Sequence, residues 1–278
     1  MPESNNNSSS KIKYRSGLPI KTIRYENELT DEFSSAIINS KKIDENYKYL
    51  HKSILWYVLR FILYRLIIMP YAFLYCKIMF RHKTKNRKIL KKLRGKGVFV
   101  YANHTQERAD AYIPTLSLFS KSVYIIVHPA NVSQKIVGKT IIPLLGALPL
   151  PDTLKAGKNF KNAIEKRVLQ GNAVVVYPEA HIWPYYTGIR EFSKASFKYP
   201  SELDEPVIAL TNTYKARKII KRPKIVTYLD GPFYPDMTLP LFERMKKLRD
   251  EVYNTMKKRS ELSNCEYIRY EKMIEENN

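Results

Sequence analysis

The residues best suited to chemistry are a histidine and an acid in one polar loop. His104 follows an apolar run at residues 98–102, and Glu107 and Asp110 come shortly after it. A carboxylate bonded to a histidine fixes the ring tautomer and stabilises the imidazolium that forms when the ring takes a proton. The loop therefore predicts a general base, His104, oriented by Asp110. Glu107 is the alternative partner because it is nearer in sequence.

A second polar segment follows a second apolar run. Residues 173–177 are β-branched and apolar, and they lead into Pro178, Glu179, Ala180 and His181. If the two runs are parallel strands of one sheet, their carboxyl ends meet at the same edge, which is where open α/β sheets bind ligands. We therefore expect the two polar loops to face one site.

The elements that must position these loops follow from the hydrophobic pattern of residues 95–278. Short β-branched runs alternate there with stretches of helical period, and a further amphipathic helix begins near Leu241. Apolar strands interleaved with helices indicate an α/β fold with a mixed, largely parallel sheet flanked by helices. The expected strands are residues 98–102, 123–127, 173–177, 207–211 and 225–229.

The segment 54–80 is apolar and aromatic, and it is long enough to span a bilayer. Arg60 and Arg65 lie well inside it, each costing about 2.5 to 3.5 kcal/mol at mid-bilayer, and Pro70 interrupts it. The pattern therefore favours an amphipathic helix lying in the headgroup region, with its arginines on the water side. The basic run that follows, residues 81–94, would hold an anionic leaflet. The alternative is a helix docked on the domain with an ordinary solvated basic face.

The charge of the chain indicates anionic surroundings. Its net charge is +22, with 48 Lys and Arg against 26 Asp and Glu. The 21 tyrosines could stack on bases, but no nucleic-acid module is present, and the densest cations lie beside the apolar helix. We therefore expect an anionic membrane surface as the partner, and no nucleic acid. The absence of a signal-peptide pattern near residue 1 suggests the cytoplasmic face.

The expected organisation has three parts: a disordered polar tail at 1–20, a helical, basic, membrane-associating region at 21–94, and an α/β domain with C-terminal helices at 95–278. A metal site is not expected. His104, His128 and His181 are conceivable ligands, but no HxH or HExxH spacing is present. The two cysteines form no CxxC pair.

Four blocks between residues 97 and 213 resemble the glycerolipid acyltransferases of the 1-acylglycerol-3-phosphate acyltransferase type. The blocks are Asn103-His104 with Asp110, residues 142–151, Tyr177-Pro178-Glu179-Ala180, and residues 205–210. Two features depart from the family pattern. Five residues rather than four separate His104 from Asp110, which a bulge in the loop would accommodate. In addition, two arginines of the family, one after the second block and one in the third, are missing.

The resemblance implies an O-acyltransferase without a cofactor. His104 would deprotonate a hydroxyl of a glycerophospholipid precursor such as lysophosphatidic acid. The oxygen would then attack the thioester of acyl-CoA or acyl-carrier protein. The missing arginines would normally bind the acceptor phosphate, so Lys155, Lys158, Arg190, Lys194 or Lys198 could replace them. The expected substrate-binding residues are Asn103, Glu107, Pro178, Glu179, Ala180, His181 and Lys194.

The sequence is also compatible with three other functions. The same fold could acylate a non-phosphate acceptor such as a glycolipid, because the missing arginines concern only the phosphate end. It could be a catalytically inactive lipid-binding relative, or, least favoured, a basic nucleic-acid-binding protein.

Overall fold

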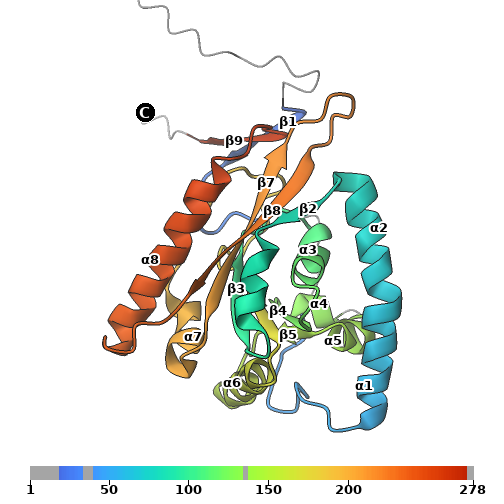
Figure 1. Ribbon diagram of the computed structural model, residues 1–278, viewed down its shortest axis with the longest axis vertical. Coiled ribbons are helices and arrows are strands. Elements are labelled where there is room, and N and C mark those ends of the chain that lie inside the picture. Colours follow the sequence, from blue (N-terminus) through green and yellow to red (C-terminus); the bar gives the residue numbers. More distant parts are fainter. Residues whose placement is uncertain (1–18, 34–39, 134–136, 274–278) are drawn as a thin grey trace, which may run out of the picture.

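The protein is built around one seven-stranded sheet (Figure 1). The computed structural model describes residues 19–33, 40–133 and 137–273. The strand order is β2-β8-β7-β3-β6-β4-β5, and every neighbouring pair is parallel except β7 with β8. The prediction of a mixed, largely parallel sheet is confirmed. The strands are β2 (Lys83–Lys85), β3 (Val98–Ala102), β4 (Val123–Val127), β5 (Ala147–Pro149), β6 (Ala173–Val176), β7 (Val207–Lys215) and β8 (Lys224–Phe233).

Helices cover both faces of the sheet, which explains why its central strands are apolar throughout. In β3, Phe99 and Tyr101 pack with α6 and α8, whereas Val98 and Val100 pack with α2 and α3. The main covering helices are α2 (Met69–Phe80), α3 (Ala109–Ser117), α6 (Leu154–Leu169) and α8 (Leu241–Ser260). Shorter helical segments are η2 (Arg87–Leu93), α4 (Ala130–Ser133), η3 (Val137–Ile141), α5 (Ile142–Leu144), η4 (Ala195–Phe197) and α7 (Lys198–Leu203).

The apolar segment forms one continuous helix, Ile54–Phe80, which is long and apolar enough to cross a membrane. It consists of α1 (Ile54–Phe61), a π-helical stretch η1 (Ile62–Ile68) and α2. The backbone N–H of Met69 bonds to the carbonyl of Tyr64, five residues earlier. This wider turn precedes Pro70, which lies in the first turn of α2, so the proline does not end the helix as the sequence suggested.

The face of this helix that carries the arginines was expected to meet water, and this prediction is wrong. Arg60 is buried: its Nη1 donates to the carbonyl of Leu144 (2.5 Å), and its guanidinium lies 4.3 Å from the Tyr124 ring centroid. Arg65 donates to the carbonyls of Phe119 and Lys121. The arginines therefore supply hydrogen-bond donors to backbone carbonyls of the α/β domain instead of facing water.

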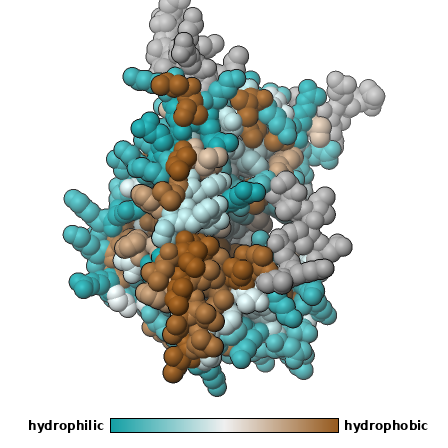
Figure 2. All heavy atoms as spheres, turned by 90° about the vertical axis from the view of Figure 1, so that its right-hand side faces the viewer, coloured by the Kyte–Doolittle hydropathy of each residue, from teal (hydrophilic) through white to brown (hydrophobic). Residues whose placement is uncertain are grey.

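The outward face of the helix is apolar. It is formed by residues that leave much of their surface exposed, and Figure 2 shows a continuous hydrophobic area over the lower part of this side of the molecule, where α1 lies. Such a large exposed apolar surface is typical of an interaction site rather than of an ordinary soluble surface. Its main residues are Leu55, Val58, Phe61, Leu66, Phe73 and Ile78.

The N- and C-terminal parts of the described chain meet in a small separate sheet. Strand β1 (Lys21–Tyr25) pairs in parallel with β9 (Ile268–Lys272). The prediction of a helical region at 21–94 is therefore too broad: helix is concentrated in residues 54–80, and β2 belongs to the main sheet. The alternating pattern of β1 lets Tyr25 pack on Trp183 while its neighbours face water. The predicted tail at 1–20 lies outside the described residues up to residue 18.

Candidate active site

The two predicted loops meet at the carboxyl edge of the sheet. β3 and β6 are parallel neighbours, so the segments that follow them lie side by side. Residues 181–186 then lie directly on the histidine loop: the N–H of Trp183 donates to the carbonyl of His104 (3.1 Å), and the N–H of Tyr185 to that of Thr105 (2.9 Å). The sequence prediction of one shared site agrees with this geometry.

The His104 ring contacts Asp110. Its Nδ1 lies 2.8 Å from Oδ2 of Asp110, which is buried in the first turn of α3. The same carboxylate oxygen accepts the backbone N–H groups of Thr105 (2.8 Å) and Gln106 (2.9 Å). A turn at residues 107–108 separates these donors from the helix, which accommodates the extra residue in the spacing. Glu107 is exposed on this turn, so Asp110 is the acid placed to orient the ring.

The hydrogen bond defines which ring nitrogen is free. A carboxylate only accepts, so Nδ1 carries the proton and Nε2 presents a lone pair. Among the described residues, no hydrogen bond to Nε2 is formed, and the side chain is 17% exposed. Tyr177 stacks on the ring at 4.3 Å, and its hydroxyl donates to the carbonyl of Asp110 (2.5 Å). Burial raises the pKa of Tyr177 well above its usual value, so the tyrosine stays protonated as a donor.

The second oxygen of Asp110 belongs to a buried chain of polar groups. Nδ2 of Asn212 in β7 donates to Asp110 Oδ1 at 3.4 Å, and Oδ1 of Asn212 accepts from the hydroxyl of Thr227 (2.6 Å). Nε2 of His82 lies 2.9 Å from the same hydroxyl oxygen. Burial, with smaller contributions from Arg87 and Lys77, lowers the pKa of His82 to about 4, so its ring is neutral at pH 7.

Asn103 connects two strands instead of facing the site. Its side chain donates to the carbonyl of Asn212 (3.1 Å) and accepts the N–H of the same residue (2.8 Å). The side chain is almost fully buried. Its amide thus holds β3 against β7 just before His104, and both of its polar ends are occupied by protein.

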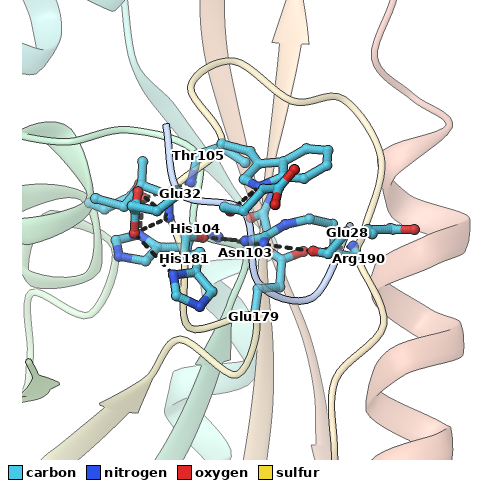
Figure 3. A network of polar contacts seen from close by, with 12 residues as sticks. Glu28, Glu32, Asn103, His104, Thr105, Glu179, His181 and Arg190 are labelled. Atoms are coloured by element: carbon cyan, nitrogen blue, oxygen red, sulfur yellow. Dashed lines mark hydrogen bonds and ion pairs between the residues drawn. The ribbon is translucent and has the colours of Figure 1, made fainter. Parts of the chain in front are cut away.

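Glu179 is likewise engaged with the protein. Its two carboxylate oxygens accept the backbone N–H groups of His104 (2.8 Å) and Arg190 (2.9 Å), and Figure 3 shows it between these two residues. Burial raises the pKa of Glu179, while the Arg190 guanidinium and the two N–H groups act in the opposite direction. The guanidinium lies 3.6 Å from the carboxylate and is itself buried. Glu179 therefore fixes the backbone of His104.

Ala180 and His181 form the turn after β6 and Pro178. Ala180 has φ of 62°, the left-handed conformation that favours glycine, and its N–H donates to the carbonyl of Tyr177. That N–H is thus committed to the turn. His181 is partly exposed, with Nδ1 3.3 Å from Oε2 of Glu32. Glu32 comes from the N-terminal segment, which no sequence pattern linked to this site.

Lys194 lies elsewhere. Its ammonium sits 3.4 Å from the ring centroid of Phe242 in the first turn of α8. Arg190, another predicted phosphate partner, points its guanidinium at Trp183 and the carbonyl of His181. Within the described residues, no group of three His, Cys, Asp or Glu side chains is arranged to hold a metal ion.

The fold of this chain is similar to that of a lipid acyltransferase. The solved structure is 1-acyl-sn-glycerophosphate (LPA) acyltransferase, PlsC, from Thermotoga maritima, with 17% sequence identity and a TM-score of 0.50. The similarity covers 73% of this chain and 86% of that chain. No protein-family model and no curated protein matches the sequence.

Proposed function

We propose that this protein is an O-acyltransferase that uses His104 as a general base. The observation that carries the proposal is the His104–Asp110 pair, with Nδ1 fixed by the buried carboxylate at 2.8 Å and the side chain partly exposed. A ring held in this tautomer accepts a proton at Nε2 without rearrangement. The pair lies on a fold similar to that of an LPA acyltransferase, which supports acyl transfer over other reactions of a His–Asp pair.

The proposed reaction is a direct transfer. Nε2 of His104 takes the proton of an acceptor hydroxyl as its oxygen attacks the thioester carbonyl of acyl-CoA or acyl-carrier protein. The carbon–sulfur bond then breaks, and the leaving thiolate receives the proton from the imidazolium. Asp110 stabilises the imidazolium between these steps. The backbone N–H groups of Thr105 and Gln106, and the side chain of Tyr177, act on Asp110 and on the His104 ring rather than on substrate.

The acceptor we propose is a glycerophospholipid precursor such as lysophosphatidic acid. One observation favours the alternative of a non-phosphate acceptor: Arg190 is buried against Glu179, and Lys194 lies on Phe242. Neither cation is free to bind a phosphate beside His104 in this arrangement. A glycolipid or another neutral hydroxyl compound would need no such cation.

We further propose that the helix Ile54–Phe80 lies on an anionic membrane, on the cytoplasmic leaflet, with its axis in the plane. Only 22% of the apolar window of this helix is buried within the protein. The buried part of the helix includes Arg60, which donates a hydrogen bond to the α/β domain from the side of the helix. A helix attached sideways to a folded domain cannot cross the bilayer without drawing that domain in, whereas it can present its outer face to the surface.

The test is to incubate the purified protein with acyl-CoA and a panel of lysolipids and glycolipids, and to identify the acylated product by mass spectrometry. We expect His104→Ala to lower the rate by at least 10²-fold, the scale of general-base catalysis. His51→Ala is the matched control, because His51 stacks on Trp56 away from the site and should keep the rate within about twofold. Substantial turnover by His104→Ala would refute the mechanism.

A further inference from the structure

A groove lies between the helix Ile54–Phe80 and the C-terminal end of α3. This groove has a volume of about 980 Å³, at the upper end of the range for sites that bind small molecules. It is lined by residues of α1, η1, α2, β2, the start of η2 and the segment 116–119, and by His82, which lies between α2 and β2. No residue of the loops 103–110 and 177–192 lines it. The groove is therefore separate from the two loops that carry His104 and Glu179, and it meets the polar chain of Asp110 only at His82.

One part of the groove is apolar. Phe61, Phe73 and Phe119 line it and are more than half exposed, while Met69 and Leu116 line it and are largely buried. Phe61 and Phe73 also belong to the outward apolar face of the helix, so the groove opens onto that face. An apolar chain could enter it from the same side that we propose meets the membrane.

The remainder of the groove is lined by cations whose charge no acidic side chain neutralises. Among the described residues, none of its lining side chains is acidic, and none of its cations forms an ion pair with a carboxylate. Its two arginines bond to backbone carbonyls, which leaves their charges unneutralised. Burial and then repulsion by Lys83, Arg81 and Lys85 lower the pKa of the nearby Lys224. The five cations are Arg65, Lys77, Lys83, Lys85 and Arg87.

We propose that this groove binds one anionic phospholipid of the membrane leaflet. The phosphate group would lie among Lys83, Lys85 and Arg87, and an acyl chain would lie along Phe73 and Phe61. A ligand with an anionic head and an apolar tail is the chemistry that satisfies both halves of the groove at once. The bound lipid is separate from the acyl-transfer substrates, so this proposal rests on the membrane location proposed for the helix but not on the acyl-transfer reaction.

The experiment uses soluble short-chain lipids with the full-length protein. Binding of dihexanoyl phosphatidylglycerol, below the concentration at which it forms micelles, is measured by calorimetry. The dihexanoyl phosphatidylcholine and inorganic phosphate serve as separate probes. We expect one saturable site for the anionic lipid, with at least tenfold weaker binding of either other probe. The double variant Lys83→Gln with Lys85→Gln should lower the affinity for the anionic lipid about thirtyfold, because each lysine contributes about 1 kcal/mol.

The matched control removes two charges outside the groove. Lys91 and Lys92 are exposed in η2 and do not line the groove, so Lys91→Gln with Lys92→Gln should change affinity by less than about twofold. Equal losses in the two double variants would overturn the proposal, because they would show attraction to overall charge. Equal affinity for the phosphatidylcholine, or for phosphate alone, would overturn it as well. All four lysines are exposed, and thermal unfolding checks that both double variants are folded.

Discussion

The loops around His104 and the helix Ile54–Phe80 both bury charged groups, but these groups have different structural roles. In the loops, the Asp110 and Glu179 carboxylates accept backbone N–H groups and hold one histidine ring in place. In the helix, the Arg60 and Arg65 guanidiniums donate to backbone carbonyls and hold an apolar surface outward. A charge in an apolar segment can thus attach a helix to its domain, and the buried acids beside His104 position it.

Asp110→Asn should give the largest effect and tests the loop side of the comparison. The amide can offer its N–H to Nδ1 of His104, which would place the proton on Nε2 and remove the free base. We expect the acyl-transfer rate to fall by roughly 10² to 10⁴-fold with little change in KM. Steady-state kinetics of the wild type and the variant measure both constants.

Glu107→Gln makes the same chemical change in the same loop and separates the two acids. Glu107 is exposed, and the contact with the ring is made by Asp110, so the rate should depend far less on Glu107. If Glu107→Gln lost more activity than Asp110→Asn, the orienting role would belong to Glu107.

Arg60→Met tests the helix side. The substitution leaves the carbonyls of Leu144 and Val123 without this donor, and each unsatisfied buried group costs about 1 to 3 kcal/mol. Part of this cost is offset because no charge is buried any longer, so we expect a net loss of about 2 kcal/mol in the free energy of unfolding. Urea unfolding in detergent measures it. Arg65→Met should cost less, since Arg65 is less buried than Arg60. A helix that spanned the bilayer on its own would instead be stabilised by Arg60→Met.

The sequence predicted the sheet well because period and composition are local. All five expected strands are found, with β7 and β8 longer than their apolar runs. The His104–Asp110 pair could also be predicted, since His104 closely follows β3 and Asp110 lies in the first turn of α3, six residues later in the sequence. The orientation of residues 54–80 could not be predicted from the sequence. An arginine on a helix face can face water or donate to carbonyls of a neighbouring domain, and the sequence does not distinguish the two. Only the position of the carbonyls of Leu144 and Phe119 decides between them.

The supporting residues of the site were missed for a similar reason. Glu32 comes from a segment far away in the chain, and no local pattern announces its contact with His181. Asn212 left a signal that went unused: it is a polar side chain within a strand that is otherwise buried. A buried polar side chain in a central strand requires partners, and those of the Asn212 side chain are Asp110 and Thr227.

His82 joins the loops around His104 to the helix Ile54–Phe80, and its predicted effect arises only on acidification. It follows the long helix directly, and its ring reaches Asp110 through Thr227 and Asn212. Its folded pKa of about 4 lies below the ordinary 6.5, so between these values the unfolded chain binds a proton that the folded chain does not. Acidification through this window therefore destabilises the wild type.

His82→Gln removes the titration but keeps an N–H for Thr227, so on acidification the variant should lose less stability than the wild type. The difference reaches at most roughly 2 kcal/mol by pH 5, at about 1.4 kcal/mol per pKa unit. Urea unfolding at pH 7 and pH 5 measures it, with the exposed His128→Gln as control. Identical pH dependence of wild type and His82→Gln would show that the His82 ring is solvated, and the two regions would then be joined by packing alone.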